Sequence, residues 1–116
     1  MTIFTRALNF PLSPSIGERV KSRVRSAVEP VGSRVTIVTA RLEDINASRG
    51  GIDKRCRLVA RLRKSAAVMA EATDADLYVA IDRAAARLRR ALVEDTRRHV
   101  TRDRRHRPSW PTLVGA

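Results

Sequence analysis

The sequence has few aromatic residues, a single cysteine and no long apolar run. Aromatic residues make up 3% of the 116 residues, which is too few for a surface that binds single-stranded RNA by stacking its bases. Cys56 is the one cysteine, so no disulfide can form within the chain, as suits a reducing cytosol. No apolar run approaches the ~20 residues of a membrane span, and the first residues lack a signal-peptide pattern. We therefore expect a soluble, cytoplasmic protein that does not bind a membrane.

Acidic residues are scarce relative to basic ones. The chain has 24 lysines and arginines against 12 acidic residues, a formal net charge of +12. Basic residues outnumber acidic ones in residues 1–50, 51–96 and 97–116 alike, so the charge is not confined to a tail. Most are arginines, whose forked donors suit phosphate oxygens. This balance predicts a polyanionic partner.

Apolar periodicity predicts four strands and two helices. Ser13 followed by Pro14 is typical of a helix start. Thr73, three residues before Asp76, resembles a capping box at the start of the last helix, with Asp74 and Asp76 in its first turn. The expected elements are a strand at 2–9, a helix from Ser13 to before Pro30, strands at 34–42, 54–63 and 67–72, and a helix at 73–99.

The expected fold class is α+β, in the order β-α-β-β-β-α. Short connections between the last three strands favour antiparallel pairing, and both helices can cover one face of a four-stranded sheet. These elements would form one domain at residues 1–98. Residues 99–116 form a basic tail that we expect to be disordered. We expect a loop at 43–53 and a turn at Lys64-Ser65.

Alternation in the strands predicts which side chains face the core. Val35 and Ile37 have the opposite parity to the other apolar residues of their strand. The inward residues expected there are Val38, Ala40 and Leu42. Those expected in the next strand are Cys56, Leu58, Ala60 and Leu62.

Arginines line the polar side of the last helix. Its apolar residues recur at helical spacing, and a second stripe on another side is basic. Like charges four residues apart are mutually repulsive, so phosphate contact explains the stripe better than a merely solvated face, which stays the alternative. The stripe residues are Arg83, Arg87 and Arg90. Arg97 follows beyond Glu94 and is grouped with the tail.

Arginines also alternate with the apolar residues of strand 54–63. We expect them on the sheet face opposite the helices, as RNA contacts, or alternatively as charges that protect the sheet from aggregation. These residues are Arg55, Arg57, Arg61 and Arg63.

No residue set predicts catalysis, a metal site or a cofactor. Glu43, Asp44 and Asp53 have no His or Cys spaced to complete a metal site. Local turn and cap roles are expected for them, and Asp53 is expected to pair with a neighbouring arginine. Cys56 is expected to be a buried apolar residue. His99 and His106 fall in or beside the tail, where no geometry would hold an acid/base pair.

Two segments resemble the bacterial hibernation-promoting factor and ribosome-associated inhibitor family. They are RLEDINASRGGIDKRCRL, residues 41–58, and EATDADLYVAIDRAAARLRRAL, residues 71–92. The resemblance extends over roughly residues 1–98. One departure is Ala47, where the short-chain branch usually has glycine after the residue that corresponds to Asn46.

The resemblance implies a non-enzymatic protein that binds rRNA of the small ribosomal subunit between head and body. Occupation of that site would exclude tRNA and mRNA, and so inhibit translation. It also implies no dimerising C-terminal domain in a chain of this length, although self-association stays possible. Positions that match the family's rRNA contacts in the last helix are Arg83, Arg87 and Arg90. Those in the first helix are Arg19, Lys21, Arg23 and Arg25.

Two other functions stay open. A general double-stranded RNA- or DNA-binding module would carry similar basic faces, and an RNA-processing enzyme would need an acid/base pair that the sequence does not show. No small-molecule substrate is expected. Trp110 could stack on a base or be an ordinary tail residue.

Overall fold

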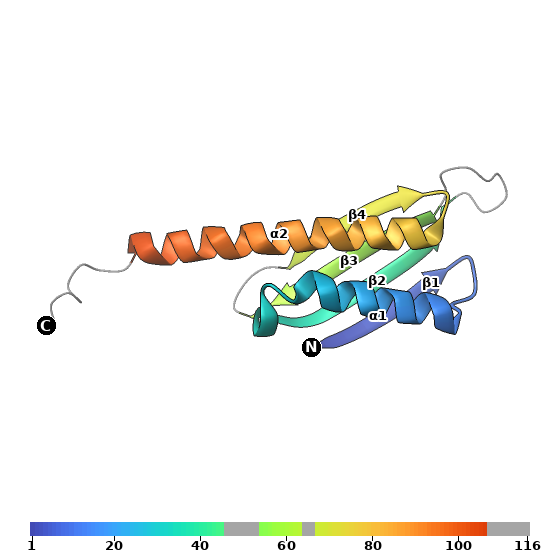
Figure 1. Ribbon diagram of the computed structural model, residues 1–116, viewed down its shortest axis with the longest axis horizontal. Coiled ribbons are helices and arrows are strands. Elements are labelled where there is room, and N and C mark those ends of the chain that lie inside the picture. Colours follow the sequence, from blue (N-terminus) through green and yellow to red (C-terminus); the bar gives the residue numbers. More distant parts are fainter. Residues whose placement is uncertain (46–53, 64–66, 107–116) are drawn as a thin grey trace, which may run out of the picture.

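A four-stranded sheet carries two helices on one of its faces (Figure 1). The computed structural model describes residues 1–45, 54–63 and 67–106, with side chains described to residue 98. The elements, in chain order, are β1 (Thr2–Leu8), α1 (Pro14–Val28), the 3₁₀ turn η1 (Gly32–Arg34), β2 (Val35–Asp44), β3 (Lys54–Leu62), β4 (Val68–Asp74) and α2 (Leu77–His106). The predicted α+β class and element order are confirmed.

The strands lie in the order β1-β2-β3-β4. β1 pairs parallel with β2, since α1 crosses over between them. β2, β3 and β4 pair antiparallel, as expected from their short connections. β1 and β4 are therefore the edges of the sheet in the part of the chain described.

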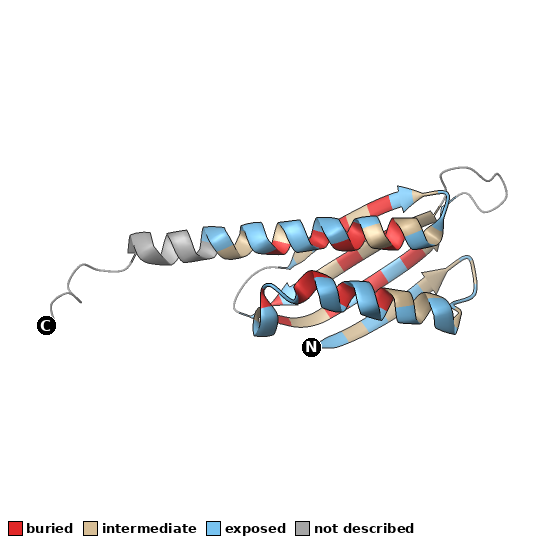
Figure 2. Cartoon of the chain, in the orientation of Figure 1, coloured by how far each residue is buried: buried red, intermediate tan, exposed pale blue. Residues whose placement is uncertain are grey.

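The core lies between the sheet and the helices, where Figure 2 shows the buried residues gathered. α2 packs on β3 and β4, and α1 lies beside α2. Val38, Ala40 and Leu42 of β2 are fully buried, which confirms the predicted parity. So are Cys56, Leu58 and Ala60 of β3, with Leu62 nearly so. The helices contribute Val20, Val24, Ile81, Leu88 and Leu92.

The start of α1 follows the prediction. The Ser13 hydroxyl accepts a hydrogen bond from the Ile16 backbone N–H at 3.2 Å, and Pro14 begins the helix. Such a cap satisfies one of the backbone donors that a helix leaves unpaired at its start. The sequence signature of Ser followed by Pro is thus realised in the fold.

The start of α2 differs from the prediction. Thr73 is exposed in β4 and does not cap the helix, and Asp74 and Asp76 precede it instead of lying in its first turn. The Asp76 carboxylate accepts from the Tyr78 backbone N–H at 2.9 Å, while its carbonyl accepts from Ala80 N–H. Asp76 is therefore the cap, because β4 extends through Asp74 and leaves no room for an earlier one.

Two other boundaries also differ. Glu43 and Asp44 belong to β2 and not to the predicted loop, because both pair in register with β3. α2 continues through His106, past the predicted end at His99, since no proline or glycine interrupts the chain before Pro108.

The remainder of the loop, the Lys64-Ser65 turn and the tail from residue 107 lie outside the described residues. No helix in the described part is long and apolar enough to span a membrane.

Candidate nucleic-acid interface

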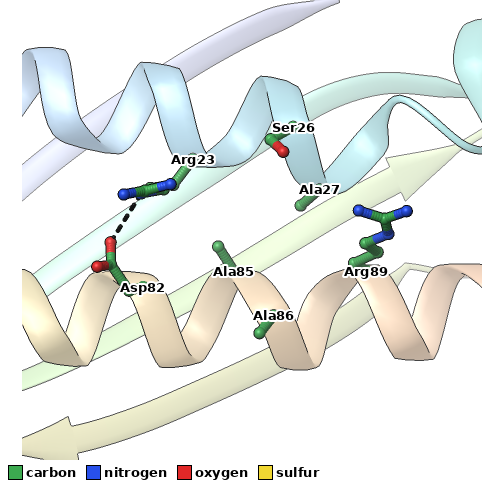
Figure 3. Close-up of a pocket in the computed structure, with 7 residues that line it drawn as sticks. All are labelled: Arg23, Ser26, Ala27, Asp82, Ala85, Ala86 and Arg89. Atoms are coloured by element: carbon green, nitrogen blue, oxygen red, sulfur yellow. Dashed lines mark hydrogen bonds and ion pairs between the residues drawn. The ribbon is translucent and has the colours of Figure 1, made fainter.

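Two arginines of α1 meet one carboxylate of α2. Arg19 donates to both oxygens of Asp82, from Nε at 3.0 Å and from Nη2 at 2.9 Å. Arg23 donates from Nε to the same Oδ1 at 2.9 Å, as Figure 3 shows. Arg19 also lies over the Tyr78 ring, 5.4 Å from its centroid. Two cations share one anion here, so the seam between the helices keeps a positive charge.

A shallow groove of about 280 Å³ continues this seam (Figure 3). Its floor is formed by alanines, and because their side chains are small, the guanidinium groups of Arg23 and Arg89 lie at its rim. The lining residues are Arg23, Ser26, Ala27, Asp82, Ala85, Ala86 and Arg89. Arg89 is exposed and has no acidic partner among the described residues.

Arg89 was missed by the sequence analysis, which followed a single stripe along the last helix. The available signal was its spacing from Asp82, because residues seven apart on a helix share a side. Only the position of α1 shows that this side borders a groove.

The other two basic residues of α1 lie on its far side. Lys21 lines a hollow over β1 together with Ile3 and Thr5. Arg25 is one turn further along the same side of the helix. Both are exposed, and neither has an ion-pair partner in the described chain. The predicted α1 set is therefore split into Arg19 and Arg23 at the seam and Lys21 and Arg25 on the outer side.

The predicted stripe of α2 lies on its β4 side. Arg83 pairs with Asp74 at 3.4 Å, and Arg87 donates to the Glu71 carbonyl at 2.7 Å. Arg90 is exposed, with no partner among the described residues. Exposed ion pairs contribute little to stability, so Arg83 can exchange Asp74 for a stronger anion. Arg90 can bind an anion without first breaking an ion pair.

The predicted strand arginines lie away from the helices, and two of them have acidic neighbours. Arg55 donates to Glu43 at 2.6 Å, and Arg57 to Glu71 at 3.0 Å, each pair directly opposite across two strands. The hydrogen bond from Arg55 lowers the pKa of Glu43, with the charges of Arg55, Arg41 and Arg57 adding to it. Arg61 and Arg63 are exposed and have no acidic partner in the described part.

Glu43 and Asp44 form ion pairs across two strands and do not take the turn and cap roles predicted for them, because both lie in β2. Glu43 pairs with Arg55, and Asp44, which is nearly buried, pairs with Lys54 at 3.3 Å. Asp53 and the side chains of His99 and His106 lie outside the description. The described residues hold no cluster of His, Cys, Asp or Glu suited to a metal ion.

The fold and this surface define an α+β domain whose helix layer presents more cations than acids. A family model described as "Sigma 54 modulation protein / S30EA ribosomal protein" matches residues 3–100. The chain belongs to this family of ribosome-associated modulation and hibernation proteins, which are not enzymes. The resemblance found in the sequence is thereby confirmed.

Solved structures share the fold. A ribosomal subunit interface protein from Coxiella burnetii superposes with a TM-score of 0.72 at 19% identity, covering 83% of this chain and 98% of that one. The N-terminal domain of Thermus thermophilus Protein Y gives a TM-score of 0.57 at 24% identity, covering 76% and 88%. No curated protein sequence matches the chain.

Proposed function

We propose that this protein binds rRNA of the small ribosomal subunit and occludes the site that tRNA and mRNA would use, which inhibits translation on idle ribosomes. Its family is ribosome-associated, which supports a place of action in the cytoplasm. The mechanism is occlusion, so no bond is made or broken. A pre-formed basic surface fills a site that the substrates of translation need.

One observation carries the choice of surface. Several exposed cations of the helix layer have no acidic partner among the described residues, and those that lie on the part of the helices packed against the sheet are Lys21, Arg25, Arg89 and Arg90. Free guanidinium and ammonium groups bind phosphate without first giving up an ion pair, and phosphate contacts dominate affinity for RNA. Arg19, Arg23, Arg83 and Arg87 border the same layer and would add to it after exchanging their present partners.

The test is co-sedimentation with purified small ribosomal subunits. The double variant Arg89→Glu/Arg90→Glu should weaken binding about tenfold or more, because two phosphate contacts become repulsions. Both side chains are exposed, so circular dichroism should show an unchanged fold.

The matched control is Arg6→Glu/Arg41→Glu, which changes the net charge equally on the opposite face of the sheet. If the two double variants lose binding equally, charge alone is being measured and the helix layer is not the docking surface.

A general duplex-binding module is the nearest rival function. Excess duplex RNA or DNA should not displace the protein from small subunits if position is set by the folded rRNA. Displacement at equal nucleotide concentration would favour the general module.

A further inference from the structure

The face of the sheet that the helices leave uncovered carries two ordered rows of side chains. We define this open face as the outward side of β1–β4, opposite the buried residues of the core. Side chains alternate along a strand, so the residues between Val38, Ala40 and Leu42, and between Leu58 and Ala60, point away from the helices. The strand register then fixes which of these residues are neighbours.

The first row is cationic. Arg6 lies opposite Arg41, Arg41 opposite Arg57, and Arg57 opposite Glu71, so the row crosses all four strands. Glu71 is bound by Arg57. Arg6 and Arg41 are exposed and form no ion pair in the described chain, although the charge of Arg41 acts on Glu43. Like charges directly opposite one another destabilise a sheet, so this pair indicates an anion that binds across β1 and β2.

The second row is largely apolar and runs beside the first. Phe4 lies opposite Thr39, Thr39 opposite Val59, and Val59 opposite Met69. It is two residues along the strands from the arginine row, about 7 Å away. Phe4 and Met69 are 56% and 57% exposed, although they are the largest apolar side chains on this face. An exposed Phe and Met in one row point to a contact with another apolar surface.

We propose that the open face is a second docking surface, for an acidic protein segment that also carries large apolar side chains. Its carboxylates would lie along Arg6 and Arg41, and its apolar side chains against Phe4 and Met69. This inference goes beyond the proposed function, because the open face lies opposite the helix layer (Figure 1).

Composition favours a protein segment over RNA on this face. The cations at its described outward strand positions are all arginines, and arginine, aromatic residues and methionine are enriched in protein interfaces whereas lysine is depleted. A single aromatic ring offers no platform for successive bases. A second copy of the chain is disfavoured, because two identical faces with unpaired arginines would repel each other.

The test uses a fluorescein-labelled peptide of aspartate and glutamate residues with one leucine and one phenylalanine. Its binding to the full chain is followed by fluorescence anisotropy, and its site by backbone amide chemical shifts. Arg6→Glu/Arg41→Glu should weaken binding about tenfold or more. Phe4→Ser/Met69→Ser should weaken it about tenfold too, since apolar contacts are lost. Arg89→Glu/Arg90→Glu, with the same charge change as the first variant, should alter it less than about threefold.

Two controls make the outcome decisive. A peptide with serine in place of leucine and phenylalanine should bind clearly more weakly, and equal binding would overturn the proposal in favour of unspecific charge. Oligouridylate should not displace the peptide. Displacement, with chemical shift changes at the amides of Phe4 and Arg41, would overturn the proposal and indicate that the open face binds RNA. No ribosome enters this experiment, so its failure is distinct from failure of the proposed function.

Discussion

Asp82 shows how a single acidic residue organises the basic surface. It holds Arg19 and Arg23 in one geometry, with its side chain 36% exposed. At that exposure the ion pairs add little to stability. Their effect is to orient two guanidinium groups along the seam between the helices, where Arg23 lines the groove that Arg89 completes.

Burial clearly changes the chemistry of Cys56. It is fully buried in β3, which confirms its predicted place in the core. Burial raises the pKa of its thiol from the ordinary 9.0 to about 12, because the charged thiolate is disfavoured away from water. The thiol is therefore protonated and unreactive in the folded protein near neutral pH.

This burial predicts a specific loss of stability at high pH. The folded state keeps Cys56 protonated, whereas the unfolded state ionises above the ordinary pKa. Its contribution is thus complete below pH 9.0 and falls between pH 9.0 and about 12, by about 1.4 kcal/mol per pH unit at most. Urea unfolding of the native chain and of Cys56→Ala measures it. The difference in unfolding free energy between the two should shrink as pH rises through this window, and a constant difference would contradict the burial of the thiol.

At the scale of elements, a shift in the pairing register of β2 accounts for the mixed parity of its apolar residues. Val35 is buried while Ile37 is half-buried and on the outward side, and the pairing register with β3 shifts between these two residues. A bulge of this kind changes the parity of a strand at one point. Alternation therefore predicted Val38, Ala40 and Leu42 correctly and could not place Val35.

α2 is anchored near both ends of its packed part. Asp76 caps its start. Further along, Arg34 of η1 donates to Thr96 at 2.5 Å and to Asp95 at 3.2 Å. Beyond this contact the helix extends past the sheet (Figure 1). Residues distant in sequence thus hold the helix that carries Arg89 and Arg90.

The cap at Asp76 predicts unequal effects of two neighbouring substitutions. Asp76→Ala should lower the free energy of unfolding by about 1 kcal/mol, since the Tyr78 N–H loses its acceptor. Thr73→Ala, at an exposed position of β4, should change the free energy of unfolding by less than about 0.5 kcal/mol. Thermal unfolding followed by circular dichroism compares them. A larger loss for Thr73→Ala would restore the capping box that the structure contradicts.

At the scale of the whole molecule, the excess charge is distributed over two faces. The helix layer and the open face each combine paired and unpaired cations, with the hydrophobic core between them (Figure 2). Beside its unpaired arginines the helix layer has the single exposed Val93, whereas the open face has both Phe4 and Met69 in one row, each more than half exposed. This difference is the reason for assigning RNA to one face and a protein segment to the other.

The net charge of +12 predicts steeply salt-dependent ribosome binding. Each neutralised phosphate contributes about −0.7 to −0.9 to the slope of log affinity against log salt concentration. Co-sedimentation across a potassium chloride series should therefore give a clearly negative slope. Arg89→Glu/Arg90→Glu should make it shallower by about 1.5 or more. A flat response of the native chain would argue against docking dominated by phosphate contacts.

The sequence by itself determined the class of fold, the element order and the identity of most core residues. These depend on local periodicity, on the Ser13 cap and on β-branched strands, whose physical causes lie within a few neighbouring residues. The resemblance to its family also rested on contiguous segments that the sequence contains.

Only the tertiary structure decided which cations are free. Asp82 is far from Arg19 and Arg23 in sequence, as Glu43 is from Arg55, and packing alone brings these charges within hydrogen-bond distance. Packing likewise placed Arg89 at a groove and set Arg6 beside Arg41. Charge pairing depends on distance in space, so composition could predict a basic protein but not where its unpaired charges lie.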